Sequence, residues 1–197
     1  MIDNHLDAAY WDKRWKSGQT GWDIGYPSPA LVDWMKYFAK YNSRILIPGC
    51  GNAYEAEALA ELGYLDIHLV DISQTAVEVI NQRCRNFEAI RCDCIDFFEL
   101  SGTYDLILEQ TFFCALEPKW RRDYVRKCSE LLEDSGLLTG VLFSSQFDKP
   151  GPPFGGTQSE YQALFQDTFD IVKMEDCYNS IPPRAGNELF ICLKKKS

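Results

Sequence analysis

Short apolar runs alternate with amphipathic stretches along most of this 197-residue chain. The runs are as long as β-strands, and several are continuously apolar, which is typical of strands buried on both faces. They lie at 45–47, 67–70, 87–92, 104–108, 137–143, 169–174 and 188–193. Helical spacing of apolar residues predicts helices at 29–38, 54–62, 73–85, 118–136 and 157–165. This alternation predicts an α/β fold with a doubly wound, Rossmann-like, seven-stranded sheet that is mostly parallel.

The end of the chain sets the direction of the last strand and the number of domains. Only a turn at 181–186 separates the last two strands, which is too short for a crossover, so the last strand is expected to be antiparallel. A Pro/Gly-rich stretch at 149–156 could be a linker, but the roughly 40 residues after it are too few for a second core. We therefore expect one domain, 1–197, with residues 1–40 as an N-terminal helical lid.

The loop after the first strand has the layout of a nucleoside-binding unit. The strand at 45–47 is followed by Gly49 and Gly51, then a helix, then a second strand ending at Asp71, about 20 residues past the glycines. Glycines let a ligand approach the backbone, and an acid at that strand tip can accept hydrogen bonds from ribose hydroxyls. The alternative is a tight turn with a helix-capping Asp. Tyr54 occupies a position where a dinucleotide fingerprint has a small residue, so an NAD-dependent oxidoreductase ranks last.

Tryptophans gather ahead of the first strand. Trp11 and Trp15 are four residues apart, so a helix places them on one face, and Trp22 follows a Gly-containing turn. They form either a hydrophobic lid packed on the core or aromatic walls around a cationic ligand, because indole faces attract cations.

Two further strand ends complete the predicted site. After the third strand, Cys94 and Ile95 are candidates to sandwich an adenine ring, and a plain turn with an N-capping Asp is the alternative. After the fourth strand, the polar-then-aromatic segment from Glu109 through Gln110 to Leu116 is a candidate substrate wall, since ligands sit beyond the carboxyl ends of such strands.

Composition narrows the function class. The formal net charge of −9 argues against a broad nucleic-acid or anionic-membrane surface. No apolar run approaches the roughly 20 residues that span a bilayer, and residues 1–5 do not have the pattern of a signal peptide. The eight cysteines are scattered, and Cys92 and Cys94 lack the second pair or histidine cluster of a zinc site. We therefore expect reduced thiols, a cytoplasmic monomer, no metal, and a small-molecule partner.

The ordered motifs resemble one family. The chain resembles the thiopurine S-methyltransferase family, and most closely its branch of thiol and halide methyltransferases. The matching segments are Trp11, Trp15, 20–23, 48–51, 70–73, 96–98, 111–115, 151–154 and 184–188. This resemblance implies a class I S-adenosylmethionine (SAM) methyltransferase fold, with SAM as the methyl donor.

The resemblance also implies roles for single residues. Trp11, Trp15 and Trp22 close over SAM, Gly49 touches its methionine portion, and Gly51 is a further cofactor-binding residue. Asp71 holds the ribose, and Cys94 and Ile95 flank the adenine. Gln110 lies beside the reacting methyl, and Arg184 belongs to a lid near the acceptor. Gln110 and Arg184 are the expected catalytic residues. A salt bridge with Glu188 is the structural alternative for Arg184.

Two departures from the family pattern stand out. The thiol and halide branch usually has Tyr, and the thiopurine branch Arg, at the position of Gln110. Ala53 stands where Gly is frequent.

The expected reaction is displacement at the SAM methyl by a soft anion: a thiolate, or a selenium compound or halide. Attack of an anion on a sulfonium removes both charges, so a dry aromatic site favours it. Thiols are partly ionised near neutral pH, so no strong base is required. A non-catalytic SAM-binding sensor or scaffold is the competing hypothesis.

Overall fold

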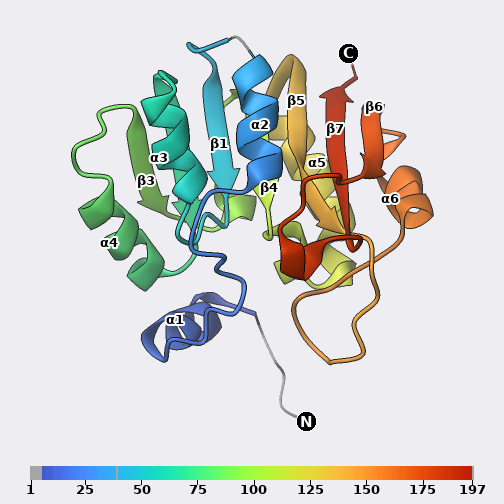
Figure 1. Cartoon of the computed structure of the whole chain (residues 1–197), viewed down its shortest axis with the longest axis horizontal. Coiled ribbons are helices and arrows are strands. Elements are labelled where there is room, and N and C mark those ends of the chain that lie inside the picture. Colours follow the sequence, from blue (N-terminus) through green and yellow to red (C-terminus); the bar gives the residue numbers. More distant parts are fainter. Residues whose placement is uncertain (1–5, 39, 197) are drawn as a thin grey trace.

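The computed structural model describes residues 6–38 and 40–196, so residues 1–5, on which the signal-peptide prediction depends, lie outside it. A seven-stranded sheet in the order β3-β2-β1-β4-β5-β7-β6 forms its centre (Figure 1). The strands are β1 (Arg44–Pro48), β2 (Asp66–Asp71), β3 (Ile90–Cys94), β4 (Tyr104–Gln110), β5 (Leu132–Phe143), β6 (Phe169–Asp176) and β7 (Glu188–Lys195). β7 is antiparallel to β5 and β6, and the other neighbouring strands are parallel. The predicted α/β fold, mostly parallel with an antiparallel last strand, is confirmed.

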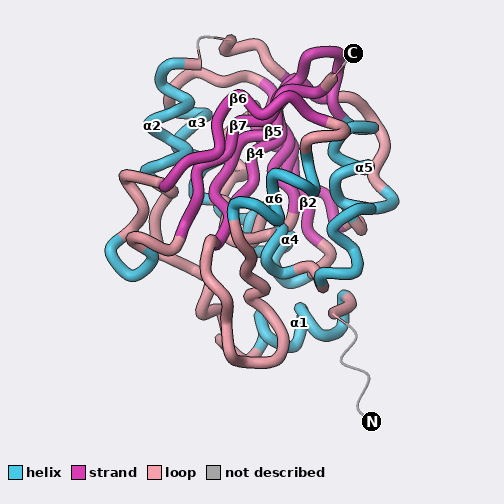
Figure 2. Tube along the Cα trace, turned by 90° about the vertical axis from the view of Figure 1, so that its right-hand side faces the viewer, coloured by secondary structure: helices cyan, strands magenta, loops and turns pink. Residues whose placement is uncertain are grey.

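Helices cover both faces of the sheet. They are α1 (Ala8–Lys16), α2 (Pro29–Tyr37), α3 (Tyr54–Glu61), α4 (Gln74–Arg83), α5 (Arg121–Leu131) and α6 (Gln158–Phe165), with short 3-10 turns at 97–99, 113–115, 118–120 and 182–184. Figure 2 shows α2 and α3 on one side of the sheet and α5 on the other. The capping box expected from Thr157 and Glu160 opens α6.

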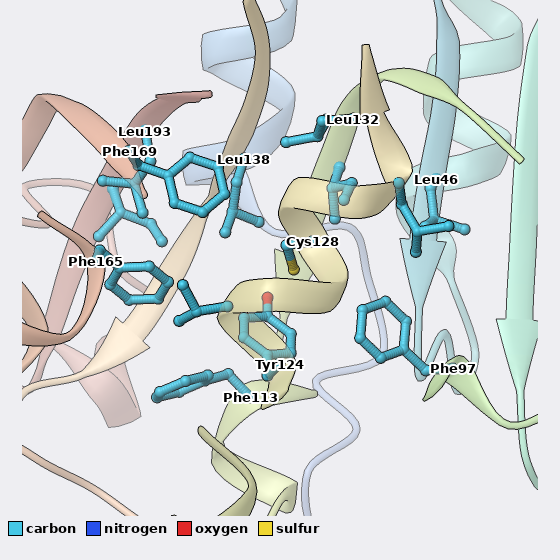
Figure 3. Packing of buried hydrophobic residues seen from close by; sticks show 14 of the residues in the cluster. Leu46, Phe97, Phe113, Tyr124, Cys128, Leu132, Leu138, Phe165, Phe169 and Leu193 are labelled. Atoms are coloured by element: carbon cyan, nitrogen blue, oxygen red, sulfur yellow. The ribbon is translucent and has the colours of Figure 1, made fainter. Parts of the chain in front are cut away.

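Each face has its own apolar core. One core packs α2, α3 and α4 on the sheet through side chains such as Met35, Leu59 and Ile80. The other packs α5 and α6 on the opposite face, where Tyr124 and Phe165 are almost fully buried (Figure 3). All eight cysteines are free, and all except Cys94 are buried.

Several boundaries differ from the predicted ones, and two of them have a clear local cause. The third strand begins at Ile90, not 87, because Phe87 bonds back to Cys84 and Ile90 back to Phe87, so turns occupy those residues. The helix expected to reach Gly136 ends at Leu131. The chain then enters β5 directly, with a register shift opposite the start of β4.

The first 40 residues divide into two parts. α1 lies beyond the carboxyl ends of the strands, apart from the two helical layers (Figures 1 and 2). α2 instead contacts α3 and β5 and buries Leu31 and Met35, so it belongs to the body of the fold. Over residues 6–38 and 40–196, no helix combines the length and apolarity needed to cross a membrane.

Candidate active site

A cavity of about 830 Å³ opens where the parallel strands end, beneath α1. Its walls come from α1, the loop after β1, the end of β2, the turn after β3, the segment after β4 and the loop at 149–153. This is the edge at which doubly wound sheets bind ligands, and the volume lies in the usual range of about 300–1,000 Å³ for small-molecule sites. A smaller cavity of about 50 Å³ adjoins it at Gly49 and Gly51.

The glycine loop presents bare backbone to both cavities. Gly49 and Gly51 have φ angles of 54° and 52°, in the left-handed region that favours glycine. A Cβ on Gly49 would lie 2.2 Å from the Phe112 ring, and one on Gly51 would lie 3.7 Å from the indole nitrogen of Trp22. Ala53 also has a positive φ, 43°, which costs an alanine about 1 kcal/mol or more. The family departure at Ala53 therefore falls on a strained position.

Asp71 lies at the tip of β2, on the wall of the larger cavity. One carboxylate oxygen accepts the backbone N–H of Gly51 at 3.0 Å, and the other accepts that of Ser73 at 2.9 Å. Burial raises the pKa of Asp71, and these backbone N–H groups partly oppose that rise. Each oxygen keeps a further lone pair, so the carboxylate can accept hydroxyl hydrogens from a ligand.

The three tryptophans come together over the cavity, and we call them the aromatic cover. The Trp22 ring centroid lies 5.5 Å from that of Trp11 and 6.2 Å from that of Trp15. Arg14 lines the same cavity, with its guanidinium carbon 5.4 Å from the Trp22 ring centroid. The sequence reasoning did not select Arg14, although it lies three residues from Trp11 and therefore on the same helix face.

Polar contacts fasten the cover to the body of the fold. The Asp12 carboxylate accepts the Ser73 hydroxyl at 2.5 Å and the Thr75 backbone N–H at 3.0 Å, at the start of α4. The hydrogen bond from Ser73, followed by that from Thr75, lowers the pKa of Asp12 to about 2. Beyond α1, Asp23 accepts the Asn52 amide at 2.6 Å.

Arg184 supplies a further contact from the other end of the chain. One guanidinium nitrogen donates to the backbone carbonyl of Trp22 at 2.8 Å, and another lies 3.4 Å from the Glu188 carboxylate. The side chains of Arg184 and Glu188 are 11% and 6% exposed, so both are nearly buried. Arg184 also lines the larger cavity, above the Phe143 ring. The salt bridge to Glu188, which the sequence offered as the structural alternative for Arg184, is present. Arg184 lines the cavity as well, so the two roles occur together.

Gln110 lies at the end of β4 and faces the smaller cavity rather than the larger one. Its side-chain oxygen is buried and has no hydrogen-bond partner among the described residues. A buried acceptor of this kind calls for a donor, which a ligand can provide.

Only one of the two adenine candidates reaches the cavity wall. Ile95 lines it, followed by Asp96, Phe97 and Phe98. Cys94 is exposed and does not line the cavity, and its thiol donates to the Ile72 carbonyl at 3.7 Å. Within the described part of the chain, no three His, Cys, Asp or Glu side chains are placed to hold a metal ion.

A further part of the cavity wall is aromatic and carries the cation of Lys149. The segment at 109–116, which the sequence predicted as a candidate substrate wall, contributes Phe112 and Leu116. The lining residues here are Phe98, Phe112, Leu116, Trp120, Phe143, Lys149, Pro152 and Pro153. The Phe98 and Trp120 rings lie 5.8 Å apart. The site thus combines the Asp71 carboxylate with a largely aromatic lining in one cavity.

Comparison with known proteins decides the family. The sequence model of thiopurine S-methyltransferase matches residues 6–193. The chain belongs to the thiopurine S-methyltransferase family. A probable thiol methyltransferase 2 from Arabidopsis thaliana is 34% identical over 195 residues, covering 95% of this chain and 85% of that protein. A thiopurine S-methyltransferase from Acinetobacter baylyi is 28% identical, covering 92% and 94%.

Solved structures support the same fold. A Burkholderia thailandensis 1,6-didemethyltoxoflavin-N1-methyltransferase with bound S-adenosylhomocysteine (SAH) superposes with a TM-score of 0.78, at 19% identity, over 96% of this chain and 87% of that one. This chain is therefore a SAM-dependent methyltransferase with a class I fold, and its cofactor is SAM. The residues present fit such a ligand, because the Asp71 carboxylate and the unpartnered Gln110 oxygen line two adjoining cavities that share the bare glycine backbone of Gly49 and Gly51.

Proposed function

We propose that this methyltransferase moves the methyl group of SAM to a small soft nucleophile, first of all a thiol, with selenium compounds and halides as further acceptors. The observation that carries the proposal is a single cavity lined by the Asp71 carboxylate, three tryptophans and further aromatic side chains. The relatives' names, thiol methyltransferase and thiopurine S-methyltransferase, support sulfur as the accepting atom.

The cofactor is proposed to lie along the glycine loop. Asp71 accepts the ribose hydroxyls with its remaining lone pairs, and Gly49 and Gly51 contact the methionine portion. Gln110 offers its unpartnered oxygen to the amino group of that portion, next to the reacting centre. Ile95 packs on the adenine from the cavity side, and Cys94 stays a candidate for its outer edge.

The chain's own residues then exclude water and attract the acceptor. SAM supplies a methyl group on a positively charged sulfur. Trp11, Trp15 and Trp22 turn aromatic faces and edges toward the cavity and close it against solvent, which favours a reaction that removes both charges. Arg14 and Arg184 place positive charge on the cavity wall of a chain with net charge −9, so an anionic acceptor is drawn to this point. A thiol with a pKa near 8.5 needs positioning more than a base.

Three broader expectations remain part of the proposal. A cytoplasmic location follows from the eight free thiols, and the acidic charge disfavours nucleic-acid or membrane partners. A monomer with a single 1–197 domain is the simplest assembly, because the described residues of one chain line all the named parts of the cavity wall.

Calorimetry with SAH, followed by turnover with thiols, selenide and halides, tests the proposal. We expect SAH to bind and at least one thiol to be methylated. SAH binding without transfer to any acceptor would favour the sensor or scaffold hypothesis. Asp71→Asn should weaken SAH binding about tenfold or more, since charge-assisted hydrogen bonds to the ribose are lost. Asp66→Asn, at the other end of the same strand and paired with Arg91, is the matched control and should bind normally.

A further inference from the structure

Glu109 is a buried acid to which the proposed mechanism gives no role. It is the penultimate residue of β4, next to Gln110, and its side chain is fully buried. β5 makes room for it, since a Cβ on Gly140 would lie 2.4 Å from the Cβ of Glu109. Burying an acid so deeply is costly unless its oxygens are well bonded.

The Glu109 carboxylate accepts three hydrogen bonds. One oxygen accepts the consecutive backbone N–H groups of Phe112 and Phe113, each at 2.8 Å. The other accepts the Tyr124 hydroxyl from α5, also at 2.8 Å. The carboxylate therefore connects the turn after β4 to the helix that covers this face.

The turn held in this way forms part of the cavity wall. Thr111 has a φ of 61°, a left-handed conformation that costs a β-branched residue energy and needs its surroundings to hold it. The next residue, Phe112, lines the larger cavity, and its ring lies against the Cα of Gly49. The position of the Phe112 ring, on the cavity wall beside the glycine loop, thus depends on the hydrogen bonds to Glu109.

No cation neutralises this acid within the described residues, because none of their ion pairs includes it. The titratable groups around it are Tyr124 and Cys128 on α5 and Cys114 in the turn, which are uncharged in their usual state. Figure 3 shows the Tyr124 hydroxyl directed toward the Cys128 sulfur. Burial raises the pKa of Glu109 to about 7, against the lowering effect of its three hydrogen bonds.

We propose that Glu109 is a positioning residue whose negative charge holds the turn at 111–113 and thereby sets the Phe112 wall of the acceptor site. Hydrogen bonds to a charged acceptor are roughly twice as strong as those to a neutral one. Protonation weakens the hold on both backbone N–H groups and obliges the Tyr124 hydroxyl to turn. The acceptor step therefore slows on the acid side of neutrality for a reason separate from ionisation of the acceptor thiol. This inference rests on the methyltransferase activity.

Glu109→Gln tests the charge with little change of shape. We expect wild-type kcat/KM to fall on the acid side of a midpoint near pH 7, by up to about tenfold for each pH unit. In Glu109→Gln, which imitates the neutral acid, kcat/KM should be lower on the alkaline side and lack this transition. Iodide, which does not titrate, is the cleanest acceptor. With a thiol acceptor, dividing the wild-type pH profile of kcat/KM by that of Glu109→Gln cancels the effect of the thiol's own ionisation. Glu99→Gln, which changes an exposed acid, is the control and should keep the wild-type profile.

A second variant guards against a change of fold. Tyr124→Phe removes one hydrogen bond that lowers the pKa of Glu109, so it should move the midpoint to higher pH. A purely structural contact would not shift a pH midpoint. An identical profile in wild type and Glu109→Gln, or an unmoved midpoint in Tyr124→Phe, would overturn the inference.

Amide NMR separates this inference from the proposed function. The backbone N–H signals of Phe112 and Phe113 should titrate with a midpoint near pH 7 in the wild type and stay constant in Glu109→Gln. This result does not require turnover. Titration of both amides without methylation of any acceptor would count against the acceptor assignment alone, whereas flat amide signals would refute the role of Glu109.

Discussion

Arg184 offers a sharp test of whether the aromatic cover belongs to the cofactor site. We consider Arg184→Met, which keeps much of the side-chain length and removes the guanidinium. The change deletes the 2.8 Å hydrogen bond to the Trp22 carbonyl and leaves the nearly buried Glu188 carboxylate without its cation. The first loss concerns closure of the cover, and the second concerns stability of the body of the fold.

The two effects have different magnitudes and can be separated. A hydrogen bond from a charged donor is worth about 1.5–3 kcal/mol, so loss of the Trp22 contact should weaken SAH binding about 10- to 150-fold. Leaving a buried carboxylate unpaired should lower the unfolding free energy by about 3 kcal/mol, the lower end of the usual range, because the Arg184–Glu188 contact is long at 3.4 Å. Adding Glu188→Gln removes the unpaired charge and should restore most of the stability without restoring SAH affinity.

Calorimetry with SAH alone, in the absence of any acceptor, is the deciding assay, and urea unfolding reports the stability. Arg126→Met is the control, since Arg126 is 69% exposed and pairs with the partly exposed Asp123 and Glu130 on its own helix. SAH affinity that stays at the wild-type value while the KM of the acceptor rises would refute the closure role and leave Arg184 as an acceptor residue only.

Four other substitutions test the surrounding geometry. Gly49→Ala should lower the unfolding free energy by about 2 kcal/mol in urea, because its Cβ meets the Phe112 ring and φ is positive. Ala53→Gly should raise it by about 0.5 kcal/mol, the relief of left-handed strain less the added chain entropy of glycine, and a lower value would contradict the strain argument. Asp12→Asn should weaken SAH binding in calorimetry roughly fivefold, by about 1 kcal/mol, and unchanged binding would separate α1 from the site. Glu109→Gln removes an acid whose pKa is raised in the folded protein. Because of that raised pKa, the wild type is most stable below pH 4.5 and becomes less stable as the pH rises to about 7. Relative to this variant, the wild type should lose up to about 3 kcal/mol over that interval in urea unfolding, and parallel curves would refute the raised pKa.

Much of the fold was predictable from the periodicity of apolar residues. The apolar runs that form strands also show where each strand ends, and therefore which residues stand in the turns and which acids stand at the strand tips. Asp71 and Gly51 were predictable in this sense, and a 3.0 Å hydrogen bond joins them. The sequence did not determine which side chains after β3 reach the cavity. Cys94 pairs with Asp71 in the sheet register and is exposed outside the cavity lining, while its neighbour Ile95 reaches the wall.

The role of long polar side chains was harder to foresee. The resemblance placed Gln110 beside the reacting methyl, and this stays a prediction. The structure shows that Gln110 faces the smaller cavity, while the preceding Glu109 is buried in the core. Arg14 was missed because a cation on a surface helix usually faces water. Its stacking on Trp22 depends on the turn that folds Trp22 back over α1, which no local pattern encodes.

The anchoring of the aromatic cover has a consequence for the order of events in turnover. Its partners Ser73 and Asn52 each lie one or two residues from a proposed cofactor contact. A change that makes these strand tips more rigid stabilises the closed state of the cover. By thermodynamic reciprocity, a more stable closed state also holds the nucleoside for longer. Departure of spent SAH requires these anchors to part together with the Arg184 contact. With a fast acceptor, we therefore expect product escape rather than methyl transfer to limit the rate.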